Sequence, residues 1–514
     1  MNYRKNYFKI YLWQTISVLL GFAALFVVVP YISSNRTIYG IYSVCTSLTI
    51  FFSYADLGFL SSGVKYAAEY YIKGQHDEEL RIIGFTSFIM LIVFSVLAIG
   101  LLFLGFFPKI LIPELIESSE QMYIARWLLF TLALFCPIII GQRLLNLIYT
   151  IRVEDYKFQR FNIIGNIVRI LSVFIFFGKD RYMLVEYYIF YQIVNLGVVV
   201  VALLYARKHY GYSLESLLLS IRFDKEIFDK VKHLAGTALI MTISSIAYLE
   251  LDQVAISNYL GLKAVAMYAV ALSVFQLVRS FCSIVYSPYT SRYNHFVGLS
   301  DYSGLIHFVK KMIMVFAPII IVPILTLSFM AEPFVVSWVG NQYSESGALV
   351  SFLVLSFIFN FVKEPIGSYF LAIERNELLI MNNIIIPLVY WGGIITMIGI
   401  INTKAFAIMK FVAPAINVSA YWFLASKNFK ANGYRFLSLA QLMKMVIPTV
   451  MIVSFFSWVF TPFLIEDYSK WALFVNLFII ALVVIFSLIA TVPFNSELRL
   501  EINHYYNSFI AKRK

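Results

Sequence analysis

The sequence predicts an all-α polytopic membrane protein with about fourteen transmembrane helices. Hydrophobic residues make up 61% of the 514 residues and charged residues only 13%, whereas soluble domains average about 25% charged residues. Apolar segments of membrane-spanning length recur along the whole chain, separated by short polar connections. Lysine and arginine concentrate in every second connection, which is typical of a chain that crosses a membrane many times.

The first expected span follows a basic N-terminal stretch, and no small-residue cleavage site comes after it. We therefore expect a retained helix in place of a cleaved signal peptide. The expected spans are 10–32, 38–60, 82–107, 124–149, 162–178, 183–206, 234–257, 264–287, 312–331, 347–371, 379–401, 404–426, 445–463 and 471–493.

The distribution of positive charge predicts the orientation. Connections on one side hold roughly 27 Lys and Arg residues and those on the other side roughly 7, and the richer side faces the cytoplasm. Both termini are therefore expected to be cytoplasmic. Topology also accounts for most of the net charge of +12, so nucleic-acid binding is not expected.

The longest internal connection, 207–233, divides the spans into two sets of six and a final pair. Ile221, Ile227 and Phe228 alternate there with charged residues, which predicts a short amphipathic helix on the membrane surface. An even number of preceding spans makes a repeat parallel, with a pseudo-two-fold axis along the membrane normal. The expected parts are an N-terminal six-helix lobe (1–206), a cytoplasmic amphipathic linker (207–233), a C-terminal six-helix lobe (234–430), and helices 13 and 14 with a cytoplasmic tail (431–514).

The two final spans, 445–463 and 471–493, have no charged residue within their apolar runs. They are therefore expected to be purely lipid-facing or to bind a lipid tail.

Several cations lie inside the expected spans, where each costs roughly 2.5–3.5 kcal/mol on insertion scales. Asn162, Asn166 and Arg169 recur at helical spacing, which places them on one face. Lipid cannot satisfy such a polar face, so it should line the bundle interior. The candidate substrate-binding residues are Arg143, Arg169, Arg279, Lys363, Lys410, Asn146, Asn166, Asn360 and Asn417.

Some of these cations have an alternative interpretation. Arg279 and Lys363 lie within a few turns of the cytoplasmic ends of their spans, and Lys410 lies near an outer end. Such side chains can extend toward headgroups or form structural pairs, and both interpretations stay open for these three. Arg169 is the most central cation, and Arg143 shares its face with Asn146, so a cavity role is favoured for these two.

Acidic residues are fewer, and four are candidates for coupling or gating: Asp56, Asp252, Glu250 and Glu364. Asp56 could equally cap a helix or form a salt bridge at the cytoplasmic face. Asp252 could gate, bind a coupling ion or pair with a neighbouring helix. Glu364 follows Lys363 directly, and adjacent side chains on a helix point apart, so we expect each to reach other helices.

Other functional classes have little support in the sequence. Cys45, Cys136 and Cys282 lie in apolar helices, which favours neither a disulfide framework nor a metal site. The chain contains no phosphate-binding Gly-rich loop with its lysine, so ATP is not expected as the direct energy source. No cofactor is expected. The outer connections are short, whereas a membrane glycosyltransferase, polymerase or ligase usually needs a sizeable loop or domain for its catalytic residues.

The chain resembles the multidrug/oligosaccharidyl-lipid/polysaccharide (MOP) exporter superfamily, and within it the polysaccharide-export branch that includes O-antigen flippases. The resemblance covers almost the whole chain in span number and loop placement. Its motifs are Tyr54-Ala55-Asp56-Leu57-Gly58-Phe59, Ile151-Arg152-Val153-Glu154-Asp155-Tyr156-Lys157, Leu251-Asp252-Gln253 with Tyr259-Leu260-Gly261, and Glu332-Pro333-Phe334 with Trp338-Val339-Gly340.

This resemblance implies a flippase of the bacterial inner membrane that moves a polyprenyl-diphosphate-linked oligosaccharide outward by alternating access. It also implies a cationic cavity between two lobes, which Arg143 and Arg169 of the first lobe and Arg279, Lys363 and Lys410 of the second would line. The implied partners are membrane lipid, a proton or sodium counter-ion, and polysaccharide polymerase machinery. The product would be O-antigen of lipopolysaccharide or a related surface polysaccharide.

Two rival functions stay open. A multidrug or toxin extruder of the same superfamily takes organic cations, which would favour acidic cavity residues over the basic ones in this sequence. A membrane glycosyltransferase or polymerase is disfavoured, because the short outer connections hold no paired catalytic residues.

Overall fold

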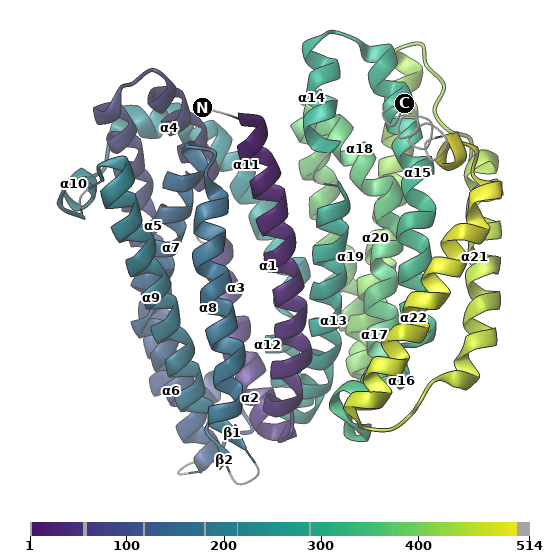
Figure 1. Ribbon diagram of the computed structural model, residues 1–514, viewed down its shortest axis with the longest axis horizontal. Helices are drawn as coiled ribbons and strands as arrows, with labels where there is room; N and C mark the ends of the chain where they lie inside the picture. The colour runs from purple at the N-terminus through teal and green to yellow at the C-terminus, as the bar shows by residue number, and fades with distance from the viewer. Residues whose placement is uncertain are drawn as a thin grey trace, which may run out of the picture. The chain divides into compact units, whose positions relative to one another are not determined.

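The computed structural model describes residues 3–54, 59–116, 119–178, 181–212, 214–286, 289–373 and 375–500, which are almost entirely helical (Figure 1). The helices form two compact units, Met1–Ala266 and Met267–Lys514, which divide within helix α13. The predicted all-α membrane fold is confirmed at this level. The division at 206, 233 and 430, which rests on the expected repeat, stays a prediction.

The first unit contains helices α1 to α12 and two antiparallel β-strands of two residues each. Its elements are α1 (Tyr3–Ile32), α2 (Arg36–Ser47), α3 (Thr49–Tyr54), α4 (Phe59–Ile72), α5 (His76–Phe106), η1 (Pro108–Ile110), α6 (Glu120–Leu134), α7 (Cys136–Ile151), α8 (Asp155–Phe176), β1 (Phe177–Gly178), β2 (Arg181–Tyr182), α9 (Leu184–Tyr210), α10 (Leu214–Ser220), α11 (Lys225–Leu249) and α12 (Asp252–Leu260).

The second unit begins within α13 and ends with the final helix pair. Its elements are α13 (Leu262–Tyr286), α14 (Thr290–Gly298), α15 (Tyr302–Phe329), α16 (Ala331–Val339), η3 (Asn341–Tyr343), α17 (Ser346–Leu355), η4 (Ser356–Phe359), α18 (Asn360–Ala372), α19 (Asn376–Ile401), α20 (Thr403–Ala431), α21 (Leu439–Phe460), η5 (Thr461–Phe463), α22 (Lys470–Thr491) and η6 (Val492–Phe494).

Side-chain caps explain where several of these helices begin. A helix leaves its first N–H groups without intrahelical partners, and a polar side chain before the first turn can accept from them. Asn35, Ser119, Asp224 and Ser438 do so at α2, α6, α11 and α21. The helix boundaries are therefore set by local sequence as well as by the apolar pattern.

Twelve helices of the described chain are long and apolar enough to cross a membrane, or thirteen if one bent pair is a single span. The count of about fourteen is thus not confirmed. The bent pair is α6 and α7, which meet at 41°. We expected one helix over 124–149, but Pro137 in the first turn of α7 cannot continue the hydrogen-bond ladder of α6.

Two other expected elements differ in the structure. The span predicted over 38–60 divides into α2 and α3 at Leu48, and its remaining residues include 55–58, which lie outside the described residues. The amphipathic helix expected around 221–231 is not separate, because α11 runs without interruption from Lys225 to Leu249. A shorter helix, α10, occupies the connection before it.

Within the first unit, basic connections predicted to share a side do meet at one end. The Lys9 ammonium lies 4.9 Å from the Tyr156 ring, and the Arg160 guanidinium lies 5.1 Å from the Trp13 ring. These contacts join the start of α1 to the start of α8. The charge asymmetry therefore predicted correctly which ends of these helices lie together.

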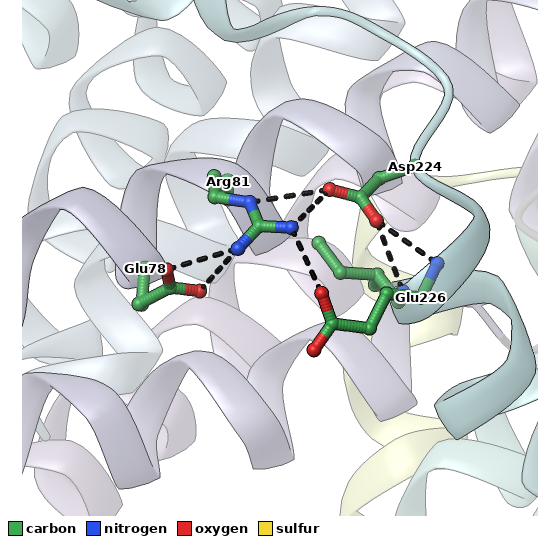
Figure 2. A network of polar contacts seen from close by, with 5 residues as sticks. Glu78, Arg81, Asp224 and Glu226 are labelled. Carbon is green, nitrogen blue, oxygen red and sulfur yellow. Dashed lines mark hydrogen bonds and ion pairs between the residues drawn. The ribbon is translucent and has the colours of Figure 1, made fainter.

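Arg81 joins the start of α5 to the start of α11 at the same basic end. Figure 2 shows its guanidinium between Glu78 and Asp224. Nη1 donates to Glu78 at 2.9 Å, and Nη2 donates to Asp224 at 2.5 Å and to exposed Glu226 at 3.4 Å. Asp224 also caps α11, so one carboxylate stabilises both a helix start and a contact between helices.

This network predicts a destabilisation in acid. The hydrogen bonds from Arg81 hold the pKa of Asp224 below its usual value, which is about 3.9. A depressed folded-state pKa contributes stability that is fully present above the unfolded-state pKa and is lost as the pH falls through the folded-state pKa. We therefore expect Asp224 to stay ionised from pH 7 to pH 5, so that it causes no change in the melting temperature of the purified protein over this range. Below about pH 4, protonation of Asp224 should lower the melting temperature.

The Asp224→Asn variant should melt lower at pH 7 and should show a smaller fall in acid. The matched control is Glu226→Gln, because Glu226 is mostly exposed and makes only the longest contact with Arg81. Equal acid sensitivity in Asp224→Asn and the wild type would contradict this assignment.

Gly84 on α5 packs directly against the carbonyl of Ser220 at the end of α10. A Cβ at Gly84 would overlap that carbonyl oxygen, and backbone cannot move aside as a flexible side chain can. We expect Gly84→Ala to destabilise the protein by about 1–3 kcal/mol, the usual cost of overpacking, measured as a drop in melting temperature. Gly100→Ala on the same helix is the control, because its Cβ would meet no atom within 4 Å.

The final helix pair is not purely lipid-facing, in contrast to the expectation. One stripe of α22 is buried, including Asn476 and Val483, and it packs against α15 and α16. The Asn476 amide donates to Pro333 O at 3.2 Å and to Ser337 Oγ at 3.1 Å, and both residues lie on α16. The expectation rested on the absence of charged residues, and asparagine carries no charge, so this polar contact was not predicted. Binding of a lipid tail by this pair stays a prediction.

Candidate functional site

Arg169 has the most informative surroundings of the predicted substrate-binding residues. It lies on α8, about 10 Å from the end of the helix by helical rise, and its exposed fraction is 8%. Its Nη2 donates to Asn166 Oδ1 on the same helix, and its Nη1 donates to Asn195 Oδ1 on α9. The ring of Tyr191 on α9 lies 4.7 Å from the guanidinium carbon.

Within the described part of the chain, Arg169 contacts two amides and a tyrosine ring but no carboxylate. Its Nε–H is buried and has no acceptor within that part of the chain. Removing a charge from water without a counter-charge is costly, and amide oxygens and a ring face offset only part of the cost. The surroundings of Arg169 therefore favour the approach of an anionic group.

Arg143 and Asn146 lie on the neighbouring helix α7, and both are partly buried. The described contacts of Arg169 involve neither of them. The structure thus joins Asn166 to Arg169, as predicted, and places Arg143 and Asn146 on the adjacent helix.

Four predicted residues gather in the second unit. Lys363 on α18 interacts electrostatically with Glu364 and with Arg279 on α13. Asn360, at the start of α18, lies near the thiol of Cys282 on α13. The start of α18 and the C-terminal third of α13 therefore form one mixed-charge cluster.

Glu364 of this cluster also reaches beyond its own helix, as expected. It interacts electrostatically with Tyr286 on α13, Tyr293 on α14 and Tyr421 on α20. The cluster therefore brings two basic side chains and one carboxylate together.

Lys410 on α20 is fully buried. Its ammonium lies 4.6 Å from the ring of Tyr390 and 6.0 Å from the ring of Phe275. This burial disfavours the alternative that Lys410 extends toward headgroups. Asn417, two turns further along α20, is also fully buried, so the predicted polar stripe lies on an interior face.

The predicted acidic residues lie in different places. Glu250 and Asp252 are buried, with exposed fractions of 7% and 1%, where α11 ends and α12 begins in the first unit. Glu364 belongs to the cluster of the second unit, and Asp56 lies outside the described residues. Coupling or gating by any of the four stays a prediction.

A buried ion pair that we did not predict lies at the basic end of the first unit. Arg152, directly after α7, donates from Nη2 to Glu79 Oε1 at 3.0 Å and to the Tyr212 hydroxyl at 2.8 Å. Its guanidinium carbon lies 4.5, 4.9 and 4.8 Å from the rings of Tyr71, Tyr210 and Tyr212. Arg152 and Glu79 are 3% and 1% exposed. From the sequence, Arg152 counts as a charge in a connection and as part of the 151–157 motif, and no partner is predicted for it.

Metal chemistry has no candidate in the described part of the chain, where no three His, Cys, Asp or Glu side chains gather as a metal site would need. The three cysteines are buried and free.

Comparisons with known proteins agree with this architecture. No family model and no curated protein matches the sequence. Among solved structures, the lipid II flippase MurJ in an inward closed conformation matches with a TM-score of 0.67 and 14% identity over 93% of this chain and 97% of that chain.

Two multidrug transporters are also similar in structure. An inward-facing MATE family transporter of the MOP superfamily matches with a TM-score of 0.59 and 14% identity over 80% of this chain and 95% of that one. An outward-facing MATE family transporter matches with a TM-score of 0.56 and 16% identity over 84% and 97%. The chain therefore has the fold of MOP-superfamily transporters, as predicted, and it is built as a multi-pass membrane protein.

Proposed function

We propose that this chain is a flippase that moves a polyprenyl-diphosphate-linked oligosaccharide across the bacterial cytoplasmic membrane by alternating access. The oligosaccharide would be a unit of O-antigen or of a related surface polysaccharide. Cationic side chains within the helices would bind the diphosphate or an acidic sugar, while the polyprenyl tail stays in lipid. Transport of this kind needs a shift between two conformational populations and no covalent step.

The observation that carries this proposal is the burial of Arg169 without a carboxylate contact in the described chain. A guanidinium presents several N–H donors in a planar fork that fits phosphate or carboxylate oxygens. Lys410 is also fully buried, and the cluster of Arg279, Lys363 and Glu364 contains two basic side chains and one carboxylate. A transporter of organic cations would gain nothing from these charges.

The structural similarities support the same class. The lipid II flippase aligns with 93% of this chain, and the two multidrug transporters align with 80% and 84%. A larger aligned share is expected if the final helix pair, α21 and α22, has a counterpart in the flippase.

The remaining candidates would have subsidiary roles. Arg143, Asn146, Asn360 and Asn417 would contact the substrate from the helices described above, and Asp56, Glu250, Asp252 and Glu364 would couple transport to a proton or sodium gradient or gate it. Membrane lipid would surround the tail, and polymerase machinery would take up the product.

Deletion of the gene in its native host tests the proposal. We expect loss of surface polysaccharide and accumulation of the lipid-linked oligosaccharide in the cytoplasmic leaflet, with both restored by the plasmid-borne wild type. Normal surface polysaccharide together with increased sensitivity to organic cations would contradict the flippase and indicate a multidrug extruder. Sugar-nucleotide turnover by the purified protein would indicate a glycosyltransferase.

A further inference from the structure

A group of aromatic and amide side chains surrounds Arg169 within the first unit. On α9, Tyr188, Tyr191, Gln192 and Asn195 recur at helical spacing and therefore share one face. Gln192 accepts from the Asn195 amide at 3.0 Å, and Asn195 in turn accepts from Arg169. The amide side chains of Asn166 and Asn195 therefore orient the guanidinium, and its Nε–H is a buried donor without an acceptor among the described residues.

Tyrosine rings extend this group to α2. The Tyr188 ring lies 6.2 Å from that of Tyr191 in a stacked arrangement, and 6.1 Å from that of Tyr42 edge-on. Tyr39 stacks on Tyr42 with centroids 6.5 Å apart. Tyr39 and Tyr188 are each 4% exposed, whereas Tyr42 and Tyr191 are only partly buried. Two partly buried rings therefore contact two buried ones.

We propose, on the basis of the flippase function above, that Arg169, Tyr191 and Tyr42 form a subsite for an acidic sugar, with the carboxylate at Arg169 and the sugar ring on the tyrosines. A pyranose ring has an apolar face of C–H groups that packs on an aromatic ring, and its hydroxyls bind amides such as Gln192 and Asn195. A diphosphate has no apolar face, so the tyrosines favour the sugar end of the substrate over the diphosphate at this place.

The guanidinium geometry fits a carboxylate. Nη1 and Nη2 each give one N–H to an amide oxygen, and the Nε–H together with the remaining N–H on the adjacent nitrogen can bind two oxygens side by side. The amides Asn166 and Asn195 are neutral acceptors, so they orient Arg169 without neutralising it. Tyr191 covers one face of the guanidinium, which fixes its plane.

Binding of soluble probes to the full chain in lipid nanodiscs tests this subsite. The probes are a trisaccharide that ends in glucuronic acid, the same trisaccharide ending in glucose, and inorganic pyrophosphate. We expect the wild type to bind the acidic trisaccharide more tightly than the neutral one. Tyr191→Leu should weaken acidic-trisaccharide binding by about tenfold, whereas Tyr191→Phe, which keeps the ring, should stay close to the wild type.

Arg169→Gln should abolish the preference for the acidic probe, and Arg160→Gln, an exposed arginine on the same helix, should preserve it. Unchanged acidic-trisaccharide binding in Tyr191→Leu would overturn the subsite. Displacement of that probe by pyrophosphate at equal affinity would overturn it too, and would make Arg169 a phosphate site.

Translocation of a neutral lipid-linked oligosaccharide in proteoliposomes separates this inference from the proposed function. If the wild type moves that lipid but Tyr191→Leu shows no binding defect, the subsite is wrong and the flippase stands. If the wild type moves no lipid-linked saccharide, neutral or acidic, the flippase is wrong.

Discussion

The Glu79→Ala variant should unfold at a markedly lower temperature, with a loss of stability of about 3–5 kcal/mol. Glu79 is the carboxylate partner of Arg152, and both side chains are almost fully buried. Removing the carboxylate leaves the guanidinium with the Tyr212 hydroxyl and the carbonyl of Ile148 as its hydrogen-bond acceptors. Neither is charged, so the buried cation loses its compensation.

Thermal unfolding of the purified protein in detergent measures this effect. Glu78→Ala is the matched control, because Glu78 lies on the same turn but forms a partly exposed pair with Arg81, and such pairs contribute at most about 1 kcal/mol. The double variant Glu79→Leu with Arg152→Met should be more stable than Glu79→Ala, since no unpaired charge is then buried. Equal melting temperatures for Glu79→Ala and Glu78→Ala would contradict a structural role for the ion pair.

The second large effect is expected on transport, from Arg169→Ala. Charge-assisted hydrogen bonds contribute about 1.5–3 kcal/mol each, so loss of the guanidinium should reduce surface polysaccharide by about tenfold or more while the protein stays in the membrane. Arg143→Ala should also impair display. Quantitative blotting of surface polymer and of the protein in membrane fractions measures both quantities.

Arg169→Lys distinguishes charge from geometry. Lysine keeps the charge but loses the planar fork, so we expect partial activity. Arg160→Ala on the same helix is the control and should display polymer normally. Wild-type display by both Arg169→Ala and Arg143→Ala would show that the assignment of these arginines to the substrate is wrong.

Much of the membrane architecture could be predicted because hydropathy and charge asymmetry are local properties of sequence. The limits of the prediction also have local causes. Pro137 lies within an unbroken apolar run, so 124–149 was expected to be one helix, although the ring ends the ladder of α6. Leu48, at the break between α2 and α3, lies in sequence that has no comparable breaking residue.

The candidate site was only partly predictable for a different reason. Helical spacing found Asn166 with Arg169 because both lie on α8, and the same spacing on α9 could have identified Gln192 and Asn195. Spacing cannot tell which two helices face each other. The contact of Arg152 with Glu79 joins residues 73 positions apart, and no periodicity within either segment indicates it.

Transport of the lipid-linked oligosaccharide can be measured after the wild-type protein is reconstituted in proteoliposomes with a fluorescent polyprenyl-diphosphate-linked oligosaccharide in both leaflets. A membrane-impermeant reagent that modifies the accessible sugar should reach about half of the lipid in protein-free vesicles and nearly all of it when the protein is present and active. Arg169→Ala vesicles should stay close to the protein-free value. The flippase function is contradicted if wild-type vesicles protect as much lipid as empty ones while they accumulate an organic cation against its gradient.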